Sequence, residues 1–341
     1  MSDRTAIHCH GISKRFNGAS ALDGLELEVP AGAILALLGP SGCGKTTALR
    51  VIAGFEHPDS GRVDIAGLRV VDADLDMPPE RRRVGMVFQE YALFPHMTVA
   101  DNVAYGLDRS ATGRVLEVLE LVGLAEHGKR MPHELSGGEQ QRVALARALA
   151  PKPAVILMDE PFSNLDAGLR DRMRRDVRAI LKEAETTTVF VTHDQEEALA
   201  IADIVAVMRA GRVVQVGPPQ HVYRRPASPW IARFVGESEF LDGVAAVGQV
   251  ETPLGTFPQF GDLRGPVQVM IRPEWVHPIR SDDGVARVVD REFYGHDQLL
   301  VLELEDGHRL AARTGSNTVV APGDRVDIGI DEVVVFPPAA G

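Results

Sequence analysis

Residues 33–50, AILALLGPSGCGKTTALR, constrain what this chain can fold into more than any other stretch of its sequence. The apolar run 33–38 predicts a short buried strand, and residues 47–54 predict a helix. Between them, residues 39–46 match the pattern G-x-x-x-x-G-K-[ST]. A strand–turn–helix setting is the one in which this pattern binds phosphate. The stretch therefore predicts an α/β fold that binds a nucleoside triphosphate.

The residue types of this loop explain why it suits a chain of phosphates. Glycines let the backbone curl so that successive N–H groups point toward one spot, and that spot faces a helix N-terminus, which favours anions. Lys45 is placed to reach the β- and γ-phosphates, and the Thr46 hydroxyl to take one position on Mg²⁺. A glycine-rich turn with a surface lysine is the alternative, and the complete motif argues against it. The predicted phosphate-binding residues are Gly39, Pro40, Ser41, Gly42, Cys43, Gly44, Lys45 and Thr46.

The composition of the 341-residue chain narrows the class of protein. With 45% hydrophobic and 25% charged residues, it is typical of a globular protein and long enough for two domains. The net charge of -12 argues against extended nucleic-acid binding, which requires a basic face. Cys9 and Cys43 form no disulfide framework, which favours a reducing cytoplasm. No apolar run reaches about 18 residues, so we expect that the chain does not span a membrane by itself.

Three further strands are predicted to end in polar side chains. Residues 84–88 lead to Gln89, residues 154–158 to Asp159 and Glu160, and residues 187–191 to His193. Ligand-contacting residues of open α/β sheets lie beyond the carboxyl ends of the strands. Two consecutive carboxylates suit magnesium chemistry, because one organises the shell of the ion and the next polarises an attacking water. An acidic turn and a structural histidine are the alternatives, and the shared position at strand ends favours catalysis.

Helical patterns replace strand patterns between residues 98 and 150, which predicts a helical insertion into the sheet. Its best-defined element is LSGGEQQR, residues 135–142. Ser136 and Glu139 form a capping box for the helix that follows. Gly137 and Gly138 expose bare backbone N–H groups at the start of that helix, so the segment also predicts a second anion site.

Three other segments are predicted to be structural. Phe16 precedes a turn, where an aromatic residue more often belongs to the core than to a platform for a base. His8 and His10 share one face of a predicted strand while Cys9 points away, and no further ligand accompanies them, so a metal site is not favoured. The three arginines at 81–83 are predicted to form a solvated basic turn.

The order of these elements resembles the ATPase subunit of ATP-binding-cassette (ABC) transporters over residues 6–236, and LSGGEQQR resembles the signature of that family. The resemblance implies that the chain binds ATP and Mg²⁺ and hydrolyses ATP. The residues that it implies to contact phosphate or magnesium are Lys45, Thr46, Thr47, Gln89 and Asp159.

The resemblance also implies roles in hydrolysis and in base binding. Glu160 resembles the general base, and His193 resembles the sensor of the γ-phosphate. Gln89 resembles the residue that links magnesium and water to the membrane partner. Phe16 takes the position of the aromatic residue that stacks on adenine, where tyrosine is commoner in the family.

A homodimer is implied as well. In this family, ATP is held between the phosphate loop of one subunit and the LSGGEQ segment of another, so a monomer is expected to be a poor ATPase. The residues implied to act in trans are Ser136, Gly137, Gly138, Glu139 and Asp166.

Beyond residue 236 the sequence changes to short β-rich runs separated by Gly, Asp and Pro turns, at 267–271, 284–290, 298–304, 309–313 and 325–335. These runs predict a small barrel-like domain. Within them, Ile271-Arg272-Pro273-Glu274 resembles an element of the oligonucleotide-fold-like (TOBE) regulatory domains of importer ATPases.

Two domains are therefore predicted. An ABC ATPase domain occupies residues 1–236, with a mixed sheet core and a helical subdomain at about 90–153. A TOBE-like domain at 237–341 stabilises a dimer and regulates it, and it lacks the basic and aromatic interleaving that would support nucleic-acid binding.

This architecture favours the ATPase subunit of an importer on the cytoplasmic face of the cell membrane. It would dock on a separate permease fed by an extracytoplasmic substrate-binding protein. The alternatives are a soluble ABC ATPase of DNA repair or translation, a module that binds ATP without hydrolysing it, and an exporter. Overall similarity favours ferric iron as the substrate, with polyamine, sulfate, quaternary amine and sugar left open. Tyr91, Leu93 and Phe94 are candidates for contact with the permease or for the core.

Overall fold

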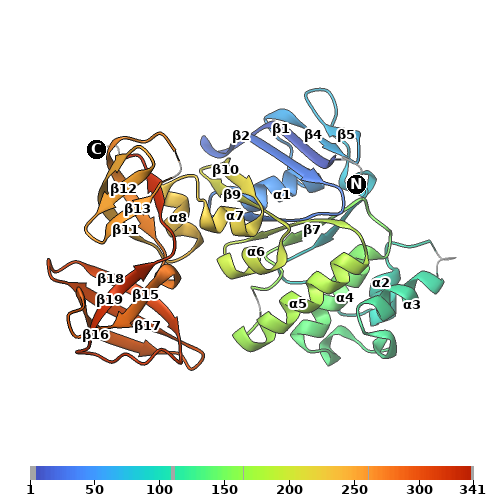
Figure 1. The fold of residues 1–341 in the computed structure, drawn as a ribbon. Coiled ribbons are helices and arrows are strands. Elements are labelled where there is room, and N and C mark those ends of the chain that lie inside the picture. The colour runs from blue at the N-terminus through green and yellow to red at the C-terminus, as the bar shows by residue number, and fades with distance from the viewer. Residues whose placement is uncertain (1–4, 109–111, 164, 260, 339–341) are drawn as a thin grey trace. The chain divides into compact units, whose positions relative to one another are not determined.

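A computed structural model describes residues 5–108, 112–163, 165–259 and 261–338, and the chain forms two compact units, Met1–Val222 and Tyr223–Gly341 (Figure 1). The division lies earlier than residue 236, so the segment before that residue belongs to the second unit. Arg272 explains why, because its guanidinium donates hydrogen bonds to the carbonyl oxygens of Tyr223 (2.7 Å) and Glu237 (2.9 Å). The buried guanidinium thereby holds this segment against the second unit.

The first unit contains two sheets. A four-stranded antiparallel sheet has the order β2-β1-β4-β5, and a six-stranded sheet has the order β10-β9-β3-β8-β7-β6, parallel except for the edge strand β10. Their bounds are β1 Thr5–Phe16, β2 Ala19–Pro30, β3 Ile34–Leu38, β4 Ser60–Ile65, β5 Leu68–Val71, β6 Val84–Val87, β7 Val155–Asp159, β8 Thr187–Thr192, β9 Ile204–Arg209 and β10 Arg212–Gly217. The strands predicted before Gly39, Gln89, Asp159 and His193 are confirmed as β3, β6, β7 and β8, with small shifts at their ends.

The strand β3 shows why the parallel sheet carries the site. All five of its residues, ILALL, are buried, since β3 lies between β8 and β9 and is covered on both faces. The parallel strands all point the same way, so the segments that follow β3, β6, β7 and β8 meet at one edge of the sheet.

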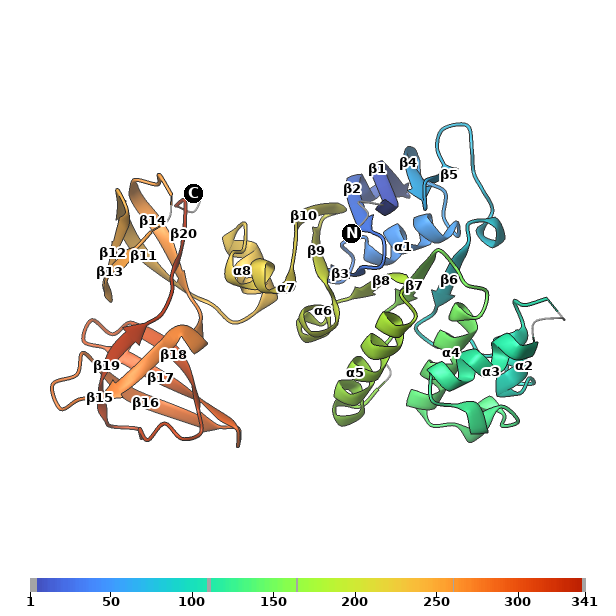
Figure 2. The same ribbon diagram turned by 45° about the vertical axis from the view of Figure 1, so that its right-hand side comes forward.

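The helices of the first unit gather in two places. α1 packs against β2, β7 and β8, whereas α2, α3 and α4 pack against one another, and α4 also packs against β6 and α5 (Figure 2). This arrangement confirms the predicted helical insertion between β6 and β7. No helix in the described ranges is both long and apolar enough to cross a membrane. The bounds are α1 Lys45–Ala53, α2 Val99–Ala104, α3 Thr112–Leu121, α4 Gly137–Leu149, α5 Ala167–Glu183, α6 Gln195–Ile201 and α7 Pro219–Arg224, with short 3-10 turns at Pro79–Arg81, Ala125–His127 and Pro132–Glu134.

The second unit is built from two five-stranded antiparallel sheets, ordered β13-β12-β11-β14-β20 and β15-β19-β16-β17-β18. Leu241 and Ile271 of the first sheet join one core cluster with Leu300 and Val326 of the second. The predicted runs correspond to β14, β16, β17 and β18, and the run 325–335 is divided into β19 and β20. The bounds are α8 Pro229–Val235, β11 Glu239–Ala246, β12 Gln249–Thr252, β13 Gly255–Pro258, β14 Gly265–Ile271, a 3-10 turn Pro273–Trp275, β15 Val276–Arg280, β16 Ala286–Phe293, β17 Asp297–Leu304, β18 Arg309–Gly315, β19 Arg325–Ile330 and β20 Val334–Phe336.

Arg82 contradicts the predicted solvated basic turn, because its side chain is fully buried. One guanidinium nitrogen donates to the carbonyl oxygens of Val51 (2.7 Å) and Ile52 (3.1 Å), in the last turn of α1. Nε donates to the carbonyl oxygen of Met77 (2.6 Å), and the other terminal nitrogen pairs with Asp76 at 2.8 Å. A cation at a helix C-terminus satisfies free carbonyls and complements the helix dipole. Arg82 therefore fastens the far end of the helix that follows the phosphate loop.

Candidate functional site

The phosphate-loop residues connect β3 to α1, as the sequence predicts. α1 begins directly after Gly44, whose φ is 106°, and no side chain caps this N-terminus. Glycine is required at this position for two reasons. Its φ lies in the left-handed region, and a Cβ would lie 2.2 Å from the carbonyl oxygen of Ala21. An uncapped helix N-terminus leaves backbone N–H groups for an anion, so this geometry suits phosphate.

Lys45 is buried and is folded back onto its own loop. Its Nζ donates to the carbonyl oxygens of Gly39 (2.7 Å) and Pro40 (3.0 Å). The Cys43 Sγ lies 3.9 Å from the same nitrogen. Burial raises the pKa of the Cys43 thiol, although the ammonium of Lys45 opposes that shift. An ammonium bonds more strongly to an anion than to a carbonyl, so a phosphate in the loop would take over Lys45.

Thr46 and Asp159 supply oxygen ligands suited to Mg²⁺. The Thr46 hydroxyl donates to Oδ1 of Asp159 across 3.2 Å, which joins the start of α1 to the end of β7. Burial raises the pKa of Asp159, and the hydrogen bond from Thr46 opposes that shift. A half-buried carboxylate beside a hydroxyl is a donor set that fits Mg²⁺. Gln89 is exposed and follows β6, the neighbour of β7, at the same edge of the sheet.

Glu160 and His193 face each other from the ends of β7 and β8. Nδ1 of His193 lies 3.2 Å from Oε1 of Glu160. Glu160 has a φ of 43°, a left-handed conformation that is strained for any residue with a side chain. Three hydrogen bonds hold it there. Its N–H donates to the carbonyl oxygen of Val191 (3.1 Å), and its own carbonyl accepts from the N–H (3.3 Å) and the hydroxyl (3.0 Å) of Ser163. Strain that is held in place this firmly is typical of functional sites.

A polar network behind His193 was not predicted. The Thr192 hydroxyl donates to Glu197 (2.6 Å), the N–H of Asp194 donates to Thr192 Oγ1 (3.0 Å), and Arg174 donates to the Asp194 carboxylate (3.0 Å). Burial raises the pKa of Glu197. The spacing of Asp194 and Glu197 at the start of α6 is a capping signal that the sequence contains. A cavity of about 90 Å³ beside this network is lined by Glu160, Ser163, Arg170, Thr192, His193, Asp194 and Glu197.

The predicted capping box of the second anion segment is confirmed. The N–H of Glu139 donates to Ser136 Oγ (3.4 Å), and the Glu139 carboxylate accepts from the N–H and the hydroxyl of Ser136 (2.8 and 2.6 Å). These bonds lower the pKa of Glu139. Gly137 opens α4, and Gly138 is buried next to Met173 of α5.

The corner before α5 is held by Asp166, whose carboxylate accepts from the N–H of Leu169 (2.9 Å). The LSGGEQ segment leads into α4, which packs against α2 and α3. The phosphate loop leads into α1, which packs against β2, β7 and β8.

Arg147 of α4 bonds to the segment that follows Gln89. Its terminal nitrogens donate to the carbonyl oxygens of Ala92 (2.6 Å) and Tyr91 (2.9 Å), both of which have positive φ. Tyr91 is buried, so it belongs to the core rather than to a docking surface. Phe94 is half-buried and its ring lies 4.4 Å from that of Tyr105, which is 62% exposed. Arg147 and Tyr105 were missed, because no local pattern singles them out.

Phe16 does not pack in the core, which is the commoner setting for an aromatic residue before a turn. Its side chain is 43% exposed at the end of β1, and the Lys14 Nζ lies 5.2 Å from the centre of its ring. The position leaves a face of the ring accessible for stacking, as the family resemblance implies.

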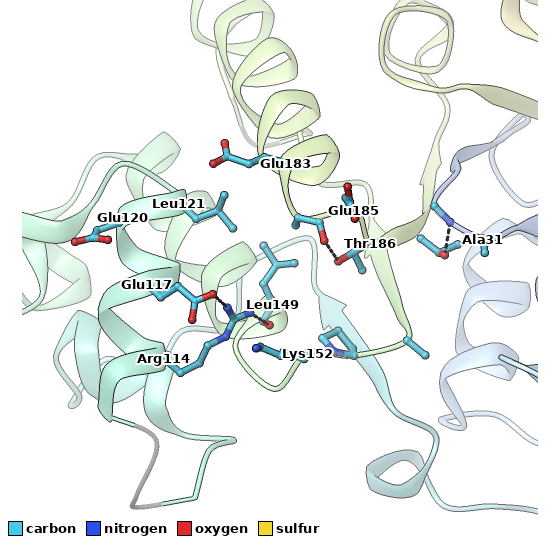
Figure 3. Close-up of a pocket in the computed structure, with 15 residues that line it drawn as sticks. Ala31, Arg114, Glu117, Glu120, Leu121, Leu149, Lys152, Glu183, Glu185 and Thr186 are labelled. Atoms are coloured by element: carbon cyan, nitrogen blue, oxygen red, sulfur yellow. Dashed lines mark hydrogen bonds and ion pairs between the residues drawn. The ribbon is translucent and has the colours of Figure 1, made fainter. Parts of the chain in front are cut away.

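A larger cavity, of about 900 Å³, lies elsewhere in the first unit (Figure 3). Residues 152–154 precede β7 and residues 183–186 precede β8, and they line the cavity together with Thr187 at the start of β8 and with Arg114 and Glu117 of α3. It contains none of the predicted site residues. Because it lies at the amino ends of the strands, the rule for open α/β sheets assigns it no part in nucleotide chemistry.

Comparison with known proteins agrees with these observations. Residues 22–163 match the model of the ABC transporter family and residues 269–336 that of the TOBE domain. The Fe(3+) ions import ATP-binding protein FbpC 1 of Rhodococcus jostii is 46% identical, covering 97% of this chain and 99% of the relative. The spermidine/putrescine import ATP-binding protein PotA of Marinobacter nauticus is 43% identical, covering 91% of this chain and 87% of the relative.

A solved structure of an ABC-transporter cassette in its ADP conformation has a TM-score of 0.60 and 25% identity, covering 68% of this chain and 99% of that one. The phosphate loop, the acidic end of β7 and the LSGGEQ helix agree with this likeness. The chain belongs to the ABC transporter family, as an ATP-binding ATPase subunit with a C-terminal TOBE domain, and it couples ATP hydrolysis to transport.

Proposed function

We propose that this chain powers the import of ferric iron through a separate membrane permease, from the cytoplasmic face of the membrane. The observation that carries the enzymatic part is the meeting of Lys45, Thr46, Asp159, Glu160 and His193 at one edge of the parallel sheet. A lysine, a hydroxyl, two carboxylates and a histidine in one place suit phosphoryl transfer to water.

Each residue at this edge has a proposed role in hydrolysis. Thr46, Asp159 and Gln89 hold Mg²⁺, which supplies Lewis-acid stabilisation of the phosphate oxygens. Glu160 takes a proton from the attacking water. His193, whose Nδ1 faces Glu160, contacts the γ-phosphate. Phe16 stacks on the adenine, and the loop residues Gly39, Pro40, Ser41, Gly42, Cys43, Gly44, Lys45, Thr46 and Thr47 bind the phosphates.

The working unit is proposed to be a homodimer with two shared ATP sites. One chain carries two glycine-flanked helix N-termini, those of α1 and α4, on separate groups of elements. An ATP on the phosphate loop of one copy is completed by the LSGGEQ segment of the other. The residues that act on the second copy's ATP are Ser136, Gly137, Gly138, Glu139 and Asp166. The TOBE domain stabilises this dimer and regulates it.

Docking of the permease is proposed at the segment that follows Gln89. Phe94 and Tyr105 form an aromatic pair there, with Tyr105 exposed. Cysteine crosslinking from position 94 or 105 to a membrane protein supports this contact. Crosslinks that form only within the chain argue against it.

Ferric iron is proposed as the substrate because the relatives that match 95% or more of this chain include three iron-import proteins of Rhodococcus jostii at 45–46% identity. Polyamine import is the second candidate, since relatives named for spermidine/putrescine import reach 48% identity over shorter matches. The substrate would be captured by an extracytoplasmic binding protein and not by this subunit.

Uptake by cells of the source organism tests the proposal. We compare labelled ferric iron and labelled spermidine in cells that carry either the wild-type chain or Glu160→Gln. Loss of iron uptake alone supports the iron assignment. Loss of spermidine uptake alone would assign polyamine and not iron as the substrate. Unchanged uptake of both compounds would contradict both assignments.

A further inference from the structure

The outer face of the antiparallel sheet in the first unit carries a second cluster of ligand-type side chains. Along β1, Ile7 and Cys9 are buried, whereas His10 is exposed and His8 partly exposed on the opposite face. Successive side chains of a strand point to opposite faces. The two imidazoles therefore share the face that is turned toward solvent.

The neighbouring strand β2 brings carboxylates to the same face. Leu25, Leu27 and Val29 are buried, and Glu26 and Glu28 alternate with them on the exposed side. His8 pairs with Glu28 in the ladder, which places Glu26 beside His10. The prediction that no further ligand accompanies the histidines was therefore wrong. The missing ligand comes from another strand, which the local sequence does not show.

The geometry of these side chains fits a metal ion. One ligand atom each of His8, His10 and Glu26 lies within 4.8 Å of the others. Nδ1 of His10 is 3.1 Å from Oε2 of Glu26, while Oε1 of Glu26 accepts from the N–H of Gly11 (2.9 Å). Gly11, with φ of 62°, lies in a bulge of β1. The backbone thereby anchors one carboxylate oxygen and leaves the other turned toward the imidazole.

We infer that His8, His10 and Glu26 bind a divalent first-row transition-metal ion of the Zn²⁺ or Fe²⁺ class. Two imidazoles and one carboxylate are the ligands of open zinc and non-haem iron sites, in which water fills the remaining positions. Mg²⁺ prefers an all-oxygen shell, so the Mg²⁺ that accompanies ATP does not compete here. The inference does not depend on the identity of the transported substrate.

The surrounding charges select Glu26 as the carboxylate ligand. Asp64 of β4 lies opposite His8, but the Arg69 guanidinium donates to it across 2.5 Å. Glu28 accepts from the Thr5 hydroxyl across 2.5 Å. Glu26 is thus the carboxylate that lies against an imidazole in this cluster.

Calorimetric titration of the untagged, nucleotide-free full chain with Zn²⁺ tests this site. We expect wild type to bind about one equivalent, and His8→Ala, His10→Ala and Glu26→Gln each to weaken binding about tenfold or more, since even outer-shell changes cost that much. Ni²⁺ should bind more tightly than Mn²⁺, in the Irving–Williams order, and anaerobic Fe²⁺ should lie between them.

His57→Ala is the matched control. His57 is a surface histidine whose Nδ1 lies 3.1 Å from Asp76, so it offers a histidine–carboxylate pair without a second imidazole. This variant should bind Zn²⁺ like wild type. A second measurement needs no substitution: Zn²⁺ should protect His8 and His10 of the wild-type chain from diethylpyrocarbonate, as mapped by mass spectrometry. Absence of Zn²⁺ binding by wild type, or equal binding by wild type and His10→Ala, overturns the inference.

Discussion

Replacing Arg82 by methionine tests whether the end of α1 depends on one buried cation. Methionine has a similar length and an apolar stem, so it fills much of the same space and removes the charge and the donors. The carbonyl oxygens of Val51, Ile52 and Met77 then lose the Arg82 donors at 2.7, 3.1 and 2.6 Å. Gly54, which ends α1, would also lose the guanidinium that lies against it.

The magnitude follows chiefly from the carbonyls of Ile52 and Met77, because the Val51 carbonyl oxygen also accepts from the N–H of Gly54 at 3.3 Å. Each buried acceptor left without a donor costs about 1–3 kcal/mol. The ion pair with Asp76 adds little, because the Asp76 side chain is 51% exposed. Burial of the methionine side chain offsets part of the loss. We therefore expect Arg82→Met to lower the free energy of unfolding by about 2–4 kcal/mol.

Urea unfolding followed by far-UV circular dichroism measures this loss. The signal reports chiefly on the first unit, which contains α1 to α6, whereas the two tryptophans, Trp230 and Trp275, lie in the second unit. Arg81→Met is the matched control, since Arg81 is exposed and its replacement should change the free energy of unfolding by no more than about 0.5 kcal/mol. Equal midpoints for the two variants would refute this account of Arg82.

Three further predictions concern the site. Ser136→Ala should cost about 1 kcal/mol of unfolding free energy in thermal melts near neutral pH. The hydrogen bonds from Ser136 lower the pKa of Glu139. The stabilisation that they give is therefore present above the unfolded-state pKa of Glu139, and it should vanish as pH falls through the folded-state pKa of Glu139. Burial raises the pKa of Asp159, so the nucleotide-free chain should lose stability as pH rises from the unfolded-state to the folded-state pKa of this carboxyl group. Asp159→Asn should remove this pH dependence of stability and melt at a higher temperature at neutral pH. It should also lose ATP hydrolysis. Arg147→Met should accelerate amide hydrogen exchange in residues 89–95, and unchanged exchange there would contradict the proposed hold on this segment.

Residues whose role follows from local chain geometry could be predicted from the sequence. The phosphate loop lies between β3 and α1, and Ser136 caps α4, because the strand, the glycine turn and the capping pair act over a few neighbouring residues. The position of the site at one edge of the sheet could also be predicted, because apolar strands that end in Gln89, Asp159 and His193 mark the carboxyl ends of parallel strands.

Side chains that act across the fold could not be predicted in this way. Arg82 is read as solvated from its basic neighbours, and only the position of α1 shows that it caps a helix C-terminus. Arg147 reaches residues far earlier in the chain, and Glu26 joins His8 and His10 through strand pairing. Such contacts depend on tertiary structure, and the local sequence around each residue does not indicate them.

The second unit was predicted less completely. The runs that match β14 and β16 to β18 alternate or are strongly apolar, whereas β11 to β13 and β15 were missed. Val244 of β11 and Val247 in the turn after it are apolar but exposed, so the apolar residues of this stretch do not show the alternating sequence pattern that a strand prediction requires. Gly243 also interrupts the strand pattern in the sequence of β11. The structure needs glycine there, because a Cβ would lie 2.8 Å from the carbonyl oxygen of Glu251 on the paired strand.

The central claim is that ATP binds between two copies of this chain and that Glu160 is needed to hydrolyse it. Size-exclusion chromatography with light scattering of Glu160→Gln, with ATP and Mg²⁺, tests it directly. We predict a stable dimer for this variant, and a monomer when Lys45→Ala or Ser136→Arg is added. Elution of Glu160→Gln as a monomer at saturating ATP and Mg²⁺ would contradict the account.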